Sequence, residues 1–138
     1  IDDIIRRSRV CRLGLCDGGQ PYIVPMSFGY DGEALYFHAA SQGRKVDILT
    51  KNNRVCFEFD ILHDVIRADR PCRWGMRYES VIGFGTAEHI WDLQAREKAL
   101  ACIMRQFGGP DGSFEEAALE NTLVIRVRID EIGGKARL

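Results

Sequence analysis

The segment from Phe37 to Lys45 combines residue types that together could hold a phosphate group. Its sequence, FHAASQGRK, places small residues between an apolar run and two adjacent cations. Small residues let backbone N–H groups approach an anion, and the start of a helix adds partial positive charge. Arg44 offers a bidentate fork for phosphate oxygens, and Lys45 offers a point charge. The pattern predicts a phosphate-binding turn, and the alternative is a polar turn whose Arg44 and Lys45 are solvated.

His38 stands immediately before this turn, at the end of an otherwise apolar run. A histidine can donate a proton near neutral pH or lie against a ring, so it could serve chemistry beside a bound phosphate compound. The alternative interpretation of His38 is a packed, hydrogen-bonded residue at the end of a strand.

A second cluster, Cys72, Trp74, Met76 and Tyr78, is better explained by core packing or a subunit contact, because large aromatics often anchor interfaces.

Several classes of function are excluded by what the sequence lacks. It has no P-loop, no H-E-x-x-H and no G-x-S-x-G motif. Gly83-Phe84-Gly85 lies inside a predicted strand, so it lacks the context of a dinucleotide fingerprint. His38, His63 and His89 fall in three different elements, and no metal site is expected.

Charge and hydropathy exclude two kinds of partner. The 19 Lys and Arg residues are balanced by 20 Asp and Glu residues, which gives a net charge of −1. That balance argues against nucleic-acid binding, which needs a basic excess on one face. No apolar run is long enough to span a bilayer, so no membrane partner is expected. Five cysteines without a C-x-x-C pair are typical of reduced thiols in a cytoplasmic protein.

The elements that must position the turn are mostly strands. Alternating apolar residues predict strands over 10–15, 22–30 with a break in pairing at Pro25, 34–40, 55–59, 78–91 and 123–130. Helical spacing predicts helices over 43–51 and 92–107 and one or two turns over 114–120. Residues 60–75 have no clean period and are predicted to form a loop. Gly83 and Gly85 indicate a bulge or a close approach of another backbone.

This order of elements favours one closed architecture. Early hairpins and few helices leave too little chain for crossovers between parallel strands, so the sheet is expected to be antiparallel. Closing it removes exposed edges. We therefore expect a mainly β fold with a few helices, a six-stranded antiparallel barrel with helices at its openings, formed by residues 1–138 as a single domain.

A series of short motifs adds a family resemblance to this interpretation. They are VCRLG at 10–14, QPYIVP at 20–25, LYFHA at 35–39, GRKVD at 43–47, VCFEF at 55–59, YESVIGFG at 78–85 and IGGK at 132–135. The order and spacing of these motifs resemble those of the pyridoxamine 5'-phosphate oxidase-like FMN-binding split barrels. Within them the chain resembles the 5-nitroimidazole resistance, or Nim-type, flavoproteins.

The resemblance implies a homodimer that holds two FMN molecules at its interface, with each site built from both subunits. It assigns the phosphate to Ser41, Gly43, Arg44 and Lys45. It assigns the flavin ring to Pro25, Met26, Ser27, His38, Ala39 and Ser80, where Ser80 stands at a position that often carries a flavin-contacting glutamine. His38 matches the Nim-type histidine beside the flavin.

The activity that the resemblance implies is the reduction of small electron-poor aromatics such as nitroimidazoles, with His38 as proton donor or positioning group. The alternative is a non-catalytic carrier or sensor of flavin or haem, and a deazaflavin would fit the same phosphate turn. Residues 134–138 do not match the C-terminal tail of true pyridoxamine phosphate oxidases, which carries their substrate-binding arginine. Vitamin B6 oxidation is therefore not expected.

Overall fold

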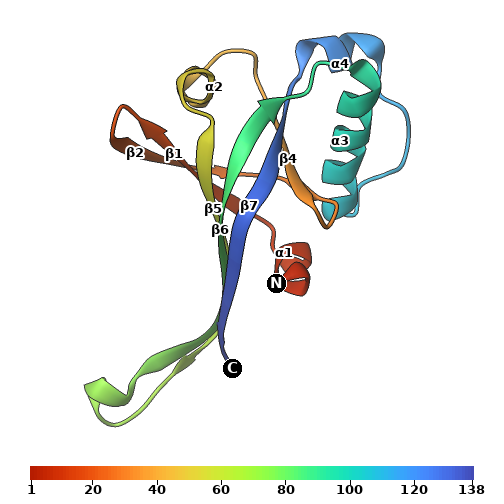
Figure 1. Ribbon diagram of the computed structural model, residues 1–138. Coiled ribbons are helices and arrows are strands. Elements are labelled where there is room, and N and C mark those ends of the chain that lie inside the picture. Colours follow the sequence, from red (N-terminus) through yellow and green to blue (C-terminus); the bar gives the residue numbers. More distant parts are fainter.

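Seven antiparallel strands form one strongly bent sheet in the computed structural model, which describes residues 1–138 (Figure 1). Their spatial order is β2-β1-β5-β6-β7-β4-β3. The strands are β1 Cys11–Asp17, β2 Gln20–Met26, β3 Gly29–Tyr30, β4 Ala34–Ala39, β5 Arg54–Ile66, β6 Gly75–His89 and β7 Leu123–Arg137. The helices are α1 Asp2–Arg7, α2 Arg44–Lys51, α3 Leu93–Gln106 and α4 Glu116–Asn121, with a short 3-10 helix at Pro71–Arg73. The mainly β class is confirmed.

The strand count and the closure differ from the prediction. The two edge strands, β2 and β3, are not hydrogen-bonded to each other, so the sheet is open, and it has seven strands where six were expected. The additional strand arises because residues 22–30 form β2 and β3 rather than one strand. The predicted break at Pro25 is wrong, since Pro25 lies opposite Arg12 within β2. An edge strand tolerates proline because the missing N–H can face solvent.

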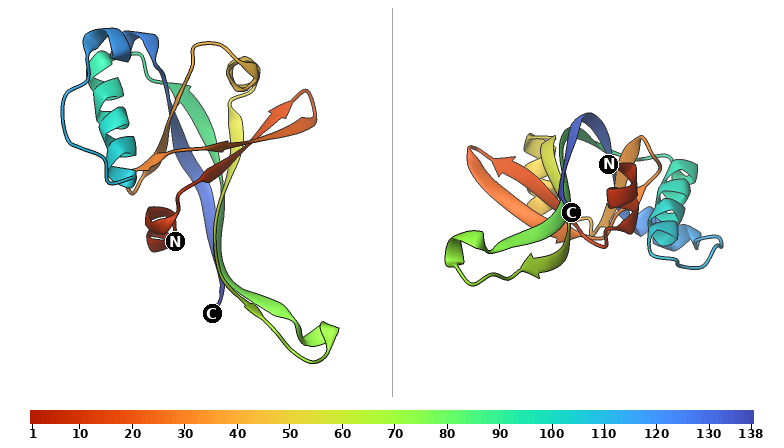
Figure 2. Two further views of the ribbon diagram at one scale, coloured as in Figure 1. Left: turned by 180° about the vertical axis from the view of Figure 1, so that it is seen from behind. Right: turned by 90° about the horizontal axis from the view of Figure 1, so that it is seen from below.

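The predicted loop at 60–75 is wrong for residues 60–66 and Gly75, which belong to the strands of a long hairpin, and only 67–74 lie outside these strands. β5 and β6 stay paired as far as Ile66 and Gly75, and the 3-10 helix forms the tip. Figures 1 and 2 show this hairpin extending away from the rest of the molecule. Its outer part lacks neighbouring elements on either face, so no alternation of apolar and polar residues marks it in the sequence. β7 similarly runs to Arg137 instead of ending near residue 130.

The concave face of the sheet encloses one hydrophobic core of 19 buried residues drawn from the strands, α1, α2 and the segment between β2 and β3. Phe28, Phe57 and Phe59 are fully buried there. Phe59 meets Phe28 edge to face at 4.8 Å and Phe57 at 6.1 Å between ring centres. Edge-to-face contacts of this kind add roughly 0.5–1.5 kcal/mol each beyond the area they bury. The curved sheet is thus held by packing, although it is not closed by hydrogen bonds.

Gly83 and Gly85 stand where another backbone comes close, as predicted. A Cβ at Gly83 would lie 2.2 Å from the Phe57 ring and 2.8 Å from the carbonyl oxygen of Glu131. A Cβ at Gly85 would lie 2.4 Å from the carbonyl oxygen of Arg128. The register between β6 and β7 shifts between Phe84 and Gly85, which confirms the bulge.

Helix α3 covers part of the convex face. It begins at Asp92, whose side chain accepts the Ala95 N–H at 2.9 Å, and it contacts β3, β4 and β7 (Figure 1).

The three predicted helices are confirmed with small shifts of their ends, while α1 lies in a segment for which no element was predicted. No helix has the length and apolar character needed to cross a membrane.

Candidate functional site

The turn between β4 and α2 exposes small and cationic residues side by side. Ser41, Gly43 and Arg44 are exposed and Lys45 is half-buried. Gly43 precedes α2 with a φ of 144°, a conformation that other residues rarely adopt, and it sets the chain into the helix. The first N–H groups of a helix have no acceptor within it. The turn therefore offers N–H donors and two cations on one exposed surface, which are the donors that a phosphate needs.

Arg44 is also held in place by a contact that the sequence did not reveal. Its guanidinium carbon lies 4.4 Å from the centre of the Tyr22 ring. Such a stack contributes about 0.5–1 kcal/mol at an exposed site. Because Tyr22 lies on β2, Arg44 is positioned from the neighbouring edge of the sheet. No local motif links two residues so far apart in the sequence.

His38 lies on the convex face near the end of β4. It is exposed, and its side chain forms no hydrogen bond within the chain. The interpretation of His38 as a packed, hydrogen-bonded residue is therefore wrong. The neighbouring Ala39 is buried against the core, so only its backbone could contact a ligand on the convex side.

Residues 25–27 form the end of β2 and the start of the connection to β3. Pro25 and Ser27 are exposed, whereas Met26 is 8% exposed and belongs to the core. β3 pairs with β4 through Gly29 opposite Tyr36. The ladder does not extend to Ser27; extrapolating its register by two residues would place Ser27 opposite His38.

Ser80 lies far along the sheet from His38 and the turn before α2. It lies opposite Lys135 on β7, whereas His38 lies opposite Val124. These positions are 11 residues apart along β7, which is roughly 35 Å of strand at about 3.3 Å per residue. Within one chain, Ser80 and the turn before α2 cannot contact the same flavin ring.

An aromatic pair that sequence analysis did not assign to the site lies near the turn. His89 and Trp91 stack with ring centres 5.4 Å apart and an angle of 18°, and Trp91 is 72% exposed. Both border a cavity of about 300 Å³ that Ser41 also lines. Buried Arg96 supports Trp91 from α3, with its guanidinium carbon 5.9 Å from the ring, and donates to the Ile90 carbonyl at 2.7 Å. A histidine and a tryptophan two residues apart at the end of a strand, such as His89 and Trp91, are common in ordinary packing. The sequence therefore gives no signal that assigns this pair to a site.

The fold defines a class of protein, a split β-barrel with an exposed turn of small and cationic residues before its second helix. A protein-family model described as pyridoxamine 5'-phosphate oxidase matches residues 1–136. The chain therefore belongs to the pyridoxamine 5'-phosphate oxidase-like family, whose members bind flavins.

Solved structures show the same fold. A candidate 5-nitroimidazole antibiotic resistance protein from Bacteroides thetaiotaomicron is 36% identical, with a TM-score of 0.88 over 97% of this chain and 80% of that one. A FAD and haem binding protein from Mycobacterium smegmatis is 23% identical, with a TM-score of 0.88 over 98% of this chain and 68% of that one. A flavocytochrome from Azotobacter vinelandii is 22% identical, with a TM-score of 0.84 over 99% of this chain and 65% of that one. A search of curated protein sequences finds no significant match.

Proposed function

We propose that the protein is an FMN-binding oxidoreductase that reduces small electron-poor aromatics such as nitroimidazoles. One observation carries the proposal: a turn with the donors for a phosphate, ending in Arg44 and Lys45, follows directly on β4, whose exposed His38 faces outward. A group that binds this turn through its phosphate would extend its ring toward His38. The five free cysteines suit a reducing compartment such as the cytoplasm.

The residues present fit the phosphate end of such a cofactor. Gly43 supplies the backbone conformation, Arg44 is already oriented by Tyr22, and Lys45 adds a second positive charge. Charge-assisted hydrogen bonds to phosphate are about twice as strong as neutral ones. Ser41 adds a hydroxyl on the same exposed surface. The cost of ordering these groups is low because α2 and β2 hold them before any ligand binds.

The remaining residues would orient the ring and the substrate. FMN, when bound, supplies the electron-transfer chemistry. The backbone at Pro25 and Ser27 is exposed and could face the edge of the ring. The His38 side chain forms no hydrogen bond within the chain, so a nitrogen of its imidazole can hold a proton or deliver it to the substrate. The neighbour named for nitroimidazole resistance, at 36% identity, supports this choice of substrate class.

A bare apolar surface supports assembly as a homodimer. On the convex face one cross-strand row contains Ile23, Gly14, Cys56 and Phe84. Ile23 is 66% exposed and Phe84 46% exposed, and Ile82 in the adjacent row is 51% exposed. Monomeric proteins rarely leave such contiguous apolar surface open. We propose that a second copy covers this face, which would also place that copy's Ser80 beside the flavin.

The dimer is expected to sediment at about twice the 15.6 kDa chain mass. Replacing Phe84 with Asp should convert it to monomers, because an unpaired carboxylate would be buried in the interface. Leu138→Asp, the same change at an exposed apolar residue outside the rows, should leave the dimer intact. Sedimentation velocity at micromolar concentration measures both variants. A wild-type protein that sediments as a monomer with its flavin bound would refute the shared site.

The cofactor itself is tested by the absorption spectrum of the purified protein and by the mass of the compound that denaturation releases. The proposal predicts the spectrum of an oxidised flavin and the mass of FMN, at about one molecule per chain. Release of FAD or a deazaflavin would refute FMN while keeping the phosphate turn. A Soret band without flavin would favour the haem carrier.

A further inference from the structure

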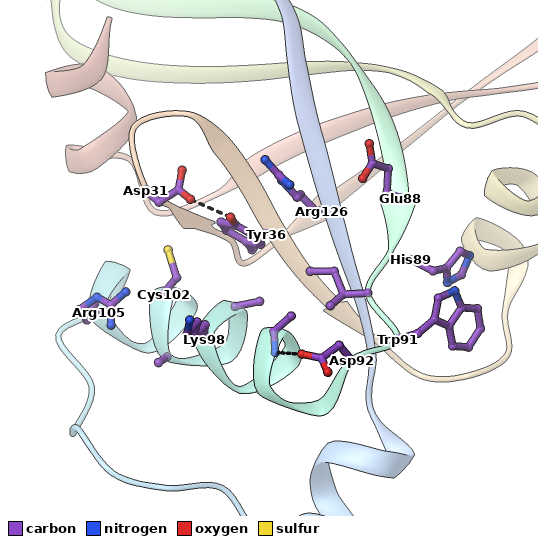
Figure 3. A pocket seen from close by; sticks show the side chains of 14 residues that line it. Asp31, Tyr36, Glu88, His89, Trp91, Asp92, Lys98, Cys102, Arg105 and Arg126 are labelled. Carbon is purple, nitrogen blue, oxygen red and sulfur yellow. Dashed lines mark hydrogen bonds between the residues drawn. The ribbon is translucent and has the colours of Figure 1, made fainter.

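A cleft separates α3 from the convex face of the sheet. Its volume is about 600 Å³, which is in the range of small-molecule sites. Tyr36 of β4, Arg126 of β7 and Glu88 of β6 line the sheet side, and Lys98 and Cys102 line the helix side (Figure 3). None of the residues assigned to the flavin lines this cleft.

The cleft is open because α3 presents small side chains to it. Ala95, Ala99 and Ala101 line the helix wall, so the helix does not fill the space above the strands. At one end the stacked pair of Trp91 and His89 forms an aromatic wall (Figure 3). A flat apolar body could lie between the alanines and the strands, against that wall.

The acidic groups in the cleft are already engaged. Asp31 accepts hydrogen bonds from the Tyr36 hydroxyl at 2.7 Å and from the N–H groups of Ala34 and Glu33 at 2.8 and 2.9 Å. Burial opposes ionisation of Asp31, but these hydrogen bonds outweigh it and lower the pKa of the carboxyl. Burial, followed by the bond to Asp31, raises the pKa of Tyr36 to about 12, so Tyr36 remains a donor. Asp92 caps α3.

The cationic groups form no ion pair, although the charge of Arg126 helps to lower the pKa of the Asp31 carboxyl. Arg126, Lys98 and Arg105 take part in none of the ion pairs of the chain. Glu88 lies directly across from Arg126 in the sheet register, yet its nearest cation is Arg128, at 3.9 Å. The Nε of Arg126 is buried without a hydrogen-bond partner. Because Nε is closed to solvent, a ligand in the cleft would reach the guanidinium through its Nη groups, which form no hydrogen bond within the chain.

We propose that this cleft binds a small organic carboxylate with a flat apolar body, with the carboxylate on Arg126 and the body against the alanines of α3. The unpaired guanidinium selects an anion, and its planar fork matches two carboxylate oxygens. Lys98 and Arg105 on the opposite wall add positive potential without contacting an acid. The site is separate from the proposed flavin site, and its occupancy does not depend on it.

The test is a titration of the isotope-labelled protein followed by amide NMR, with benzoate as the probe and neutral benzamide as its matched analogue. Benzoate should cause saturable shifts at residues 95–105 and 126 with a Kd of about 1 mM or lower. The Kd of benzamide should be at least about tenfold higher than that of benzoate, because benzamide lacks the charge-assisted contact. Arg126→Gln should remove the preference for benzoate, and Lys98→Gln should weaken benzoate without changing benzamide.

Lys51→Gln, which removes one cation at the end of α2 and outside the lining, should leave both affinities unchanged. The flavin content of all three variants should equal that of the wild type. No saturable shift up to about 10 mM benzoate, tenfold above the expected Kd, would overturn the proposal. Equal binding of benzoate and benzamide, or an unchanged preference in Arg126→Gln, would overturn the role of Arg126.

Discussion

The double variant Arg44→Ala/Lys45→Ala is expected to lose FMN during purification. Each charge-assisted contact to the phosphate contributes about 1.5–3 kcal/mol, so removal of both should raise the Kd by about 10²–10⁴-fold. Arg44→Lys should lie between the wild type and the double variant, because it keeps the charge but loses the bidentate fork and the planar contact with Tyr22. Fluorescence titration of the flavin-free proteins with FMN measures the three affinities.

The matched control is Lys51→Ala/Arg54→Ala, which removes the same two charges at the far end of α2 and the start of β5. This control variant should bind FMN with nearly wild-type affinity, because Lys51 and Arg54 lie at the opposite end of α2 from Gly43. Thermal melts of all variants show whether loss of flavin precedes loss of the fold. Wild-type affinity in the double variant would disprove the phosphate turn.

The second large effect is expected at His38. His38→Gln should keep the fold and most of the FMN affinity, because the side chain is exposed and makes no internal hydrogen bond. It should slow reduction of a nitroimidazole by about 10²-fold or more, which is the usual scale for a positioned proton donor. The measurement is a single-turnover rate under anaerobic conditions, normalised to bound FMN.

Added imidazole distinguishes proton donation from simple positioning. If His38 delivers the proton, free imidazole should restore part of the rate of His38→Gln and leave the wild-type rate unchanged. His63→Gln is the control, since it changes a histidine on the outer part of the β5–β6 hairpin, where its partner is Glu79. An unchanged rate in His38→Gln would remove His38 from the chemistry and favour a carrier, or a reductase whose protons come from solvent.

Local patterns predicted the elements that carry the site well. The alternation in β1 and β4 and the helical spacing of α2 and α3 each reflect one face packed on the core, and that constraint is visible in the sequence. The position of the turn before α2 followed directly from where β4 ends. Gly83 and Gly85 were interpreted correctly because a close backbone leaves no room for a side chain.

The remaining features depend on partners distant in sequence. The outer part of the β5–β6 hairpin has no buried residue, so it lacks the one-sided pattern that reveals a strand. The stack of Arg44 on Tyr22 joins residues of α2 and β2, which no local spacing encodes. The separation of Ser80 from His38 likewise appears only when the registers of β4 and β6 on β7 are known.

The most direct test of the proposed function is the anaerobic oxidation of the reduced wild-type protein by a nitroimidazole. The holoprotein is reduced with dithionite until the flavin absorbance is bleached, the excess reductant is removed, and a nitroimidazole is added. We expect the oxidised flavin spectrum to return while the nitro absorbance of the added compound falls in proportion. If the protein stays reduced with the nitroimidazole present and regains its colour only when air is admitted, the protein is a flavin carrier and the proposed reductase activity is refuted.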